Sequence, residues 1–196
     1  NECGFVPQFE VNLTDSIEGD KCVSKYLRLR PEELEIVLRD DNVPLYVGKE
    51  APNYGGQKRL MDAMPCGAGE NSICITPEGN VIPCCSFHTL FGNIKEESIK
   101  GIIEHSKERK YWLSLSLNKY EECGRHDYCD FCNLCPGTNF SDHGTPLRAC
   151  NVNCHVAKIR HGLAKKLTEG NDPLQGKTVR EYLGELPEYI PEKIKR

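Results

Sequence analysis

The chain lacks a long hydrophobic run and a surplus of positive charge, and each absence removes a class of protein. No stretch approaches the roughly 18 consecutive apolar residues that suggest a membrane-spanning helix. The formal net charge is −4, whereas a nucleic-acid-binding surface usually needs a basic face. The first residues also lack the basic and apolar regions of a secretory signal. These features predict a cytoplasmic protein that binds neither membranes nor nucleic acids.

Apolar residues are scarce as well, whereas cysteine is abundant. Apolar side chains make up 38% of the 196 residues, which predicts a thin hydrophobic core that metal or covalent staples would reinforce. Twelve cysteines are present, and ten of them lie between Cys66 and Cys154. At this density in a polar chain, cysteine indicates chemistry rather than packing.

The spacing of the cysteines favours metal ligation over disulfides. Twelve cysteines could form six disulfides in a secreted protein, or ligate metal in a reducing compartment. Disulfide-dense domains are mostly short, but here the 65 residues before Cys66 contain only two cysteines. Steps of two or three intervening residues occur at 129/132, 132/135 and 150/154, and such steps aim two sulfurs at one ion. We therefore predict metal sites, with a disulfide scaffold as the rival interpretation.

The pattern of apolar residues predicts a small α+β fold. A β-hairpin is expected over residues 72–83, where two β-rich runs flank Pro-Glu-Gly-Asn. Helices are expected over four ranges, 31–40, about 93–117, 152–167 and 179–183. The second of these helices contains two expected breakpoints, Gly101 and Ser106. Short strands are expected at 4–12 and 45–47, and the weakly periodic residues 118–150 predict one loop organised by metal.

The cysteines form an early and a late group along the chain. Cys66, Cys74 and Cys84 surround the predicted hairpin, which can point three thiolates to one side. The late group consists of Cys123, Cys129, Cys132, Cys135, Cys150 and Cys154. Eight thiolates make two four-sulfur sites, and such a site suits either zinc or an iron–sulfur cluster.

The early group, Cys66-x12-Gly79-x4-Cys84, resembles the opening motif of the SPASM domain, the cysteine-rich C-terminal extension of many radical S-adenosylmethionine enzymes. The later stretch CDFCNLCPGTNFSDHGTPLRAC is similar to the second cysteine group of that family, and FGNIKEESIKGII resembles its connecting helix. The similarity covers residues 66 to about 165. Residues 20–40 resemble the linker that follows the catalytic barrel in these enzymes.

The resemblance implies two auxiliary 4Fe–4S clusters with interleaved ligands. By motif position, the first cluster would be bound by Cys66, Cys74, Cys84 and Cys135, and the second by Cys123, Cys129, Cys132 and Cys150. The usual second group of the family runs C-x2-C-x5-C-x3-C, whereas this chain has x5, x2 and x2 between Cys123 and Cys135. His126 could therefore replace Cys129, and Cys154 could replace Cys150.

The S-adenosylmethionine-binding motif of these enzymes, C-x3-C-x2-C, does not occur, because residue 157 after Cys150 and Cys154 is alanine. The resemblance thus implies an auxiliary part of a radical oxidoreductase or maturase that modifies a peptide or protein. This part would have no catalytic residues of its own, and would serve electron transfer or substrate docking. The expected organisation is a linker at 1–64 after a separate barrel, the cluster domain at 65–167 and a tail with a short helix at 168–196. A structural zinc-binding interaction module is the alternative function.

Overall fold

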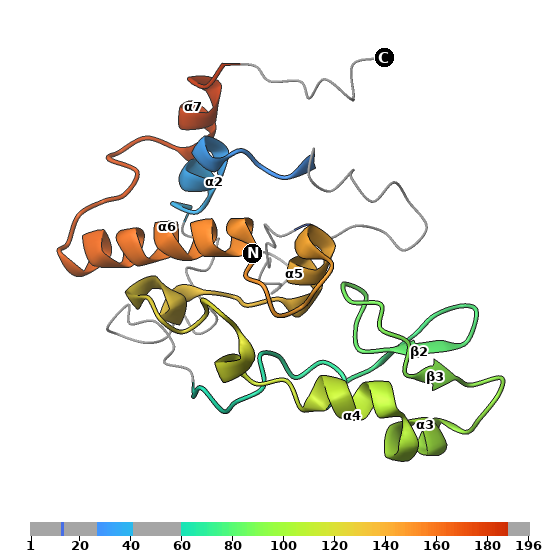
Figure 1. Ribbon diagram of the computed structural model, residues 1–196. Helices are drawn as coiled ribbons and strands as arrows, with labels where there is room; N and C mark the ends of the chain where they lie inside the picture. The colour runs from blue at the N-terminus through green and yellow to red at the C-terminus, as the bar shows by residue number, and fades with distance from the viewer. Residues whose placement is uncertain (1–12, 14–26, 41–59, 188–196) are drawn as a thin grey trace.

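The structure is a computed structural model, and it describes residues 13, 27–40 and 60–187. Its elements are α2 (Pro31–Val37), β1 (Cys74–Ile75), β2 (Asn80–Ile82), β3 (Gly92–Asn93), α3 (Ile99–His105), α4 (Lys107–Leu113), the 3₁₀ turns η1 (Leu117–Lys119) and η2 (Asp127–Phe131), α5 (Pro136–His143), α6 (Asn151–Thr168) and α7 (Val179–Gly184). Figure 1 shows the small α+β fold that the sequence predicts. The strands expected at 4–12 and 45–47 lie outside the described residues. None of the helices in the described ranges has the length and apolar character to cross a membrane.

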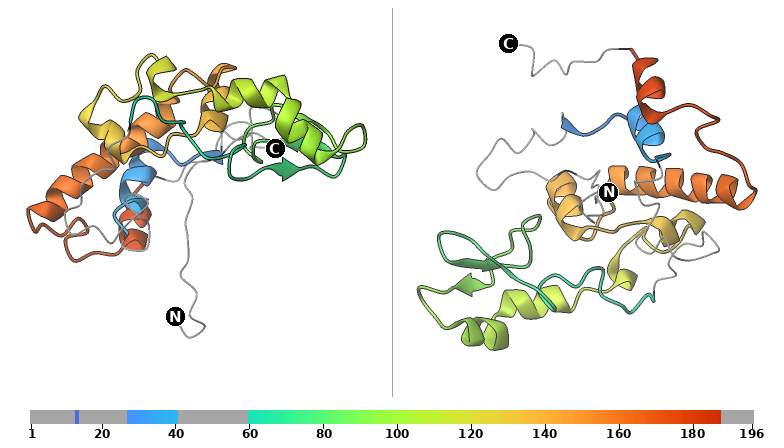
Figure 2. Two further views of the ribbon diagram at one scale, coloured as in Figure 1. Left: turned by 90° about the horizontal axis from the view of Figure 1, so that it is seen from below. Right: turned by 180° about the vertical axis from the view of Figure 1, so that it is seen from behind.

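Helix α6 is the longest element, and the helical side of the molecule is built around it. Helix α2 packs on α6 and on α7, so the three helices form a stack (Figures 1 and 2). The buried apolar residues that pack between α2, η2 and α6 are Leu34, Leu38, Phe131, Val156, Leu163 and Ala164. Helix α2 begins with proline at its first turn, and the Glu33 carboxylate accepts a hydrogen bond of 2.7 Å from the Arg30 backbone N–H.

The predicted hairpin is present and carries a third strand. β1 pairs antiparallel with β2, with Cys74 opposite Ile82, and β2 pairs antiparallel with β3, with Asn80 opposite Asn93. Gly79 has a φ of +90° and closes the turn between β1 and β2. β3 was not predicted, because Gly-Asn has no strand-forming character. Its pairing follows from Phe91, a buried residue whose backbone N–H donates to the Val81 carbonyl at 2.7 Å.

The long helix predicted at residues 93–117 is two helices, with the break at Ser106 rather than Gly101. The Ser106 hydroxyl accepts a hydrogen bond from the Arg109 N–H and so caps α4, while Ser98 caps α3 in the same way. Both helices face a second core formed by Val81, Phe87, Phe91, Ile102, Trp112 and Leu115.

Residues 118–150 are more ordered than the predicted loop, since they contain η2 and α5. Helix α5 has few apolar residues, and the sequence features that favour it lie at its two ends. Pro136 occupies the first turn, and Gly144 follows the last turn with a φ of +70°. Periodicity is therefore a poor indicator of this helix.

Candidate metal centre

Three thiols from distant segments meet between the hairpin and α5. Cys66 precedes β1, Cys84 follows β2, and Cys135 is the N-cap of α5. Burial raises the pKa of the Cys84 thiol, and the neighbouring thiols of Cys135 and Cys66 raise it further. The effect of both thiols on Cys84 places the three in one neighbourhood, which we call the first thiol group.

Each sulfur in the first thiol group accepts hydrogen bonds from the backbone. Cys66 Sγ accepts from the Ala68 N–H at 3.2 Å, and Cys135 Sγ accepts from the Thr138 N–H at 3.5 Å. The backbone N–H groups that follow Cys84 also donate to its sulfur. They lower the pKa of Cys84, whereas burial raises it. Donors of this kind stabilise the thiolate, which is the form that binds metal.

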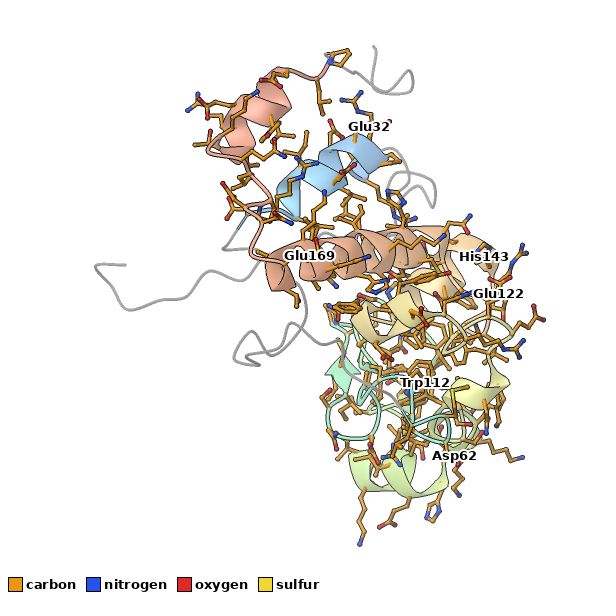
Figure 3. The ribbon with its side chains drawn as sticks, turned by 90° about the vertical axis from the view of Figure 1, so that its left-hand side faces the viewer. Glu32, Asp62, Trp112, Glu122, His143 and Glu169 are labelled. Carbon is orange, nitrogen blue, oxygen red and sulfur yellow. The ribbon has the colours of Figure 1, made fainter. Side chains whose placement is uncertain are left out.

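Helix α4 holds the loop that carries Cys66. Trp112 is 2% exposed, and its Nε1 donates to the Ala68 carbonyl at 2.6 Å. Arg109 Nε donates to the Gly69 carbonyl at 2.9 Å. The Trp112 ring also packs against Phe87 at 4.7 Å between centroids, so one side chain joins the loop to the segment after Cys84. Figure 3 labels Trp112 in the part of the molecule below α6.

The backbone of helix α5 lies in direct contact with the backbone of the segment after Cys84. A Cβ added at Gly137 would collide with the Ser86 carbonyl oxygen, so only glycine permits this approach. The contact brings Cys135, two residues earlier, beside Cys84.

Replacing Gly137 with alanine is therefore expected to push α5 away from the hairpin. We expect the free energy of unfolding of the metal-free protein to fall by about 1–3 kcal/mol, the usual cost of overpacking. Urea unfolding and iron content measure the effect on stability and on the first thiol group. Gly162→Ala is the matched control, since no atom lies within 4 Å of a Cβ at that site in α6. That change should stabilise by about 0.5–1 kcal/mol. Unchanged stability and iron content in Gly137→Ala would contradict the close contact.

Cys74, the remaining predicted ligand of the first cluster, lies on β1 opposite Ile82. Its side chain is partly exposed, like those of Cys66 and Cys84. Its role as a ligand stays a prediction.

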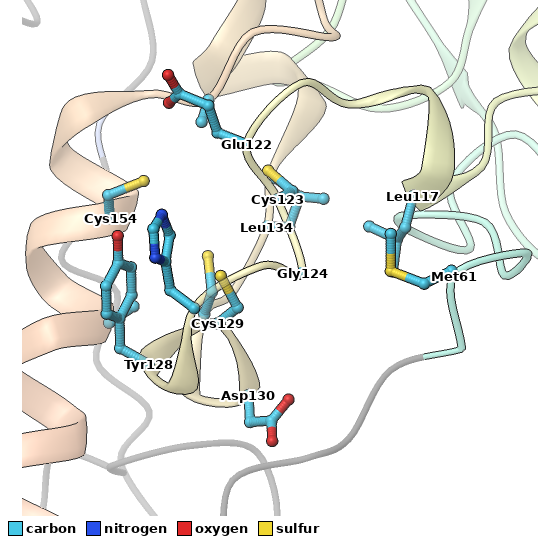
Figure 4. A pocket seen from close by; sticks show the side chains of 14 residues that line it. Met61, Leu117, Glu122, Cys123, Gly124, Tyr128, Cys129, Asp130, Leu134 and Cys154 are labelled. Carbon is cyan, nitrogen blue, oxygen red and sulfur yellow. The ribbon is translucent and has the colours of Figure 1, made fainter.

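The late cysteines line a cavity of about 270 Å³ between α6, η2 and the segment after η1. The wall contains Met61, Leu117, Glu122, Cys123, Gly124, His126, Tyr128, Cys129, Asp130, Cys132, Leu134, Ala149, Cys154 and Ala157. In Figure 4, Cys154 reaches from α6 toward the same space as Cys129, with Cys123 across it, whereas Asp130 points away. We call Cys123, Cys129, Cys132 and Cys154 the second thiol group.

Cys150 does not contribute to this cavity wall. It is 0% exposed, and its Sγ donates to Asp142 Oδ2 at 2.9 Å. The same carboxylate forms an ion pair with Arg28 at 2.8 Å, and the Cys150 N–H donates to Asn139 Oδ1. Burial and the Asp142 carboxylate raise the pKa of Cys150 to about 11, which favours the protonated thiol.

Both residues that the sequence offers as substitutes, Cys154 and His126, lie in the cavity wall. Burial raises the pKa of Cys154, and the nearby Cys129 thiol raises it further. The His126 ring stacks on the Tyr128 ring, with 4.9 Å between their centroids. Lys158 lies on α6, and its Nζ is 5.1 Å from the centroid of the Tyr128 ring. The cavity therefore contains one more possible ligand than a four-ligand cluster needs.

The size and lining of the cavity fit a polyatomic group better than one ion. Four sulfurs about 2.3 Å from a zinc ion would close around it. By contrast, a cavity of about 270 Å³ is larger than a single ion enclosed by four sulfurs would occupy. Within the described segments, no group of three or more His, Cys, Asp or Glu side chains is arranged to hold a single metal ion. The ten described cysteines are all free thiols.

Sequence reasoning did not find several residues that shape these sites. Met61 and Arg28 come from segments outside the cysteine groups, whereas Gly124 and Asp142 lie within the late group but are not residues that its spacing singles out. Gly137 is the exception that a pattern could have revealed, because Pro-Gly is a marked local signal and glycine permits a close backbone approach.

A small cysteine-rich α+β fold with thiols gathered in two places defines a metal- or cluster-binding domain. Residues 66–136 match the family model of SPASM, an iron–sulfur cluster-binding domain. The chain therefore carries a SPASM domain over these residues, as its resemblance to that family predicts.

The chain is also similar to a curated protein. Over 77 residues the chain is 38% identical to the antilisterial bacteriocin subtilosin biosynthesis protein AlbA of Bacillus subtilis (strain 168). The alignment covers 38% of this chain and 17% of that protein, so the chain spans only a small part of its relative. No solved structure shows a significant match to the chain.

Proposed function

We propose that this chain is the auxiliary iron–sulfur part of a radical S-adenosylmethionine enzyme that modifies a peptide. The observation that carries the proposal is the cavity lined by four thiols inside and beside the SPASM match. The relative is a bacteriocin biosynthesis protein, which supports a peptide as the substrate class. Cleavage of S-adenosylmethionine is assigned to a separate barrel, because C-x3-C-x2-C is absent from the sequence. We place the enzyme in the cytoplasm.

The proposed ligands follow the two thiol groups, with one revision. Cys66, Cys74, Cys84 and Cys135 would hold the first 4Fe–4S cluster. Cys123, Cys129, Cys132 and Cys154 would hold the second, in place of a set that includes Cys150. The revision is supported by the position of Cys154 in the cavity wall and by the hydrogen bond that engages Cys150 with Asp142.

The surrounding residues suit electron transfer or substrate docking at the clusters. A bound 4Fe–4S cluster exchanges single electrons at a potential set by its surroundings. Leu117, Leu134 and Ala157 give the second cavity an apolar wall that limits water. At the first thiol group, the backbone N–H groups of Ala68 and Thr138 offset the negative charge on sulfur.

Anaerobic purification tests the proposal. We expect a brown protein with broad visible absorption and about eight iron and eight sulfide per chain, as two four-iron clusters require. Cys84→Ala is the control, since it should remove about half of the iron and about half of the sulfide. A colourless protein that contains stoichiometric zinc and takes up no iron and sulfide on reconstitution would contradict it, and would favour the structural zinc module.

A further inference from the structure

Tyr120 is buried between the two thiol groups. It follows η1 and is 1% exposed. Its ring packs with Leu117 and Leu134, and Cys123 and Cys132 lie against the same small core. A tyrosine at such a position contributes an apolar ring and one polar atom, which normally finds a partner when buried.

The Tyr120 hydroxyl has no hydrogen-bond partner among the described residues, although it is buried. Leaving a buried hydroxyl unpaired costs about 1–3 kcal/mol, so an atom of this kind requires an explanation. Phenylalanine would fill the same space without that cost.

The surroundings of the hydroxyl are thiols. Burial raises the pKa of Tyr120, and the thiols of Cys123, Cys66 and Cys135 raise it further. A tyrosine phenol has an ordinary pKa of about 10, so it is a hydrogen-bond donor at neutral pH even without this shift. These three thiols are sulfurs that we assign to the clusters, and sulfur can accept a hydrogen bond from the phenol.

Two observations direct the hydroxyl toward the first cluster. Tyr120 is absent from the wall of the cavity that the second thiol group lines, where its neighbours Leu117 and Leu134 stand instead. Cys66 and Cys135, which belong to the first thiol group, both raise the pKa of Tyr120 and also that of Cys84. Of the three thiols near Tyr120, Cys66 and Cys135 belong to the first thiol group and Cys123 belongs to the second, so the larger number lies on the side of the first.

We propose that Tyr120 Oη donates a hydrogen bond to a sulfur of the cluster bound by the first thiol group. This inference rests on the proposed function, because it requires that a cluster is bound there. Tyr120 is then a positioning residue that sets the reduction potential of one cluster. A donor to sulfur stabilises the more negative, reduced state and so raises the potential.

The experiment is a redox titration of the complete chain, loaded with both clusters and followed by electron paramagnetic resonance. We expect Tyr120→Phe to bind full iron and to lower one potential by an amount that changes the oxidised-to-reduced ratio about tenfold, which is 59 mV for one electron. The affected signal should be the one that Cys84→Ala removes. The iron–sulfur stretching bands of this cluster should also become less sensitive to deuterated water, with the remaining sensitivity due to the backbone N–H donors of Ala68 and Thr138.

Two further variants make the result specific. Tyr182→Phe makes the same chemical change in α7, where the hydroxyl donates to the Leu174 carbonyl at 3.2 Å, and should leave both potentials unchanged. Fluorotyrosine placed at residue 120 is a stronger donor, and should shift the first potential in the positive direction.

Equal potentials in wild type and Tyr120→Phe, with iron content intact, would overturn this inference and leave the proposed function standing. A wild-type chain that binds no cluster would overturn both. A shift confined to the signal that survives Cys84→Ala would overturn the assignment to the first cluster.

Discussion

Replacing Cys154 with serine is expected to remove one of the two clusters, whereas replacing Cys150 with serine leaves both in place. Cys154 reaches into the cavity beside Cys129, while Cys150 is enclosed and bonded to Asp142. A serine at 150 can still donate to that carboxylate, so we expect a loss of only about 1 kcal/mol in stability. At 154, loss of a thiolate ligand should reduce iron and sulfide by about half.

Iron and sulfide analysis of the two variants, with cluster signals by electron paramagnetic resonance, measures the difference. Each serine variant is the control for the other, because they make the same change four residues apart. The reverse pattern would show that Cys150 is the ligand, and that the Arg28–Asp142–Cys150 contacts break when the cluster binds. Loss of iron in neither variant would favour His126 as the fourth ligand.

Replacing Trp112 with alanine should cause the largest loss of stability in the domain. The side chain is buried, and large-to-small changes at buried aromatic residues cost about 3–5 kcal/mol. The change also removes the donor to the Ala68 carbonyl, which frees the loop of Cys66. The first cluster should therefore be lost with little change at the second.

Urea unfolding of the metal-free protein and iron analysis of the loaded protein test this prediction. Tyr111→Ala is the matched control, because its side chain is the neighbouring aromatic on α4 and is 58% exposed. It should change stability by no more than about 0.5 kcal/mol. Trp112→Phe keeps most of the ring but not the N–H, and should separate the effect of packing from that of the hydrogen bond. Similar losses in Trp112→Ala and Tyr111→Ala would contradict the role assigned to Trp112.

The elements that could be predicted from sequence are those with strong local signals. The turn at Gly79 and its flanking β-rich runs were enough to predict β1 and β2. Apolar periodicity was enough to predict α6. Proline at the first turn with early glutamates was enough for α2. The cysteine spacing was enough to identify the SPASM domain, though not to choose between neighbouring cysteines.

The remaining features depend on tertiary contacts that spacing does not encode. Cys150 and Cys154 lie about one helical turn apart, and only the position of Asp142 on α5 shows which thiol is engaged elsewhere. β3 exists because Phe91 is buried, and α5 because its ends are favourable rather than its face. The position of Tyr120 between the thiol groups has no sequence signature at all.

The ion pair between Arg28 and Asp142 joins residues that are 114 positions apart. The apolar face of α2 likewise packs against α6, which is distant in the sequence. On the ribosome, Leu34 and Leu38 are made before the cysteine-rich region, and their partners on α6 are made only at its end. Contacts of such long range slow folding, and an apolar face exposed meanwhile promotes aggregation. The cysteines, by contrast, can begin to acquire iron and sulfide before the helices close over them. Yield in a heterologous host should then depend on cluster supply and on chaperones during this interval.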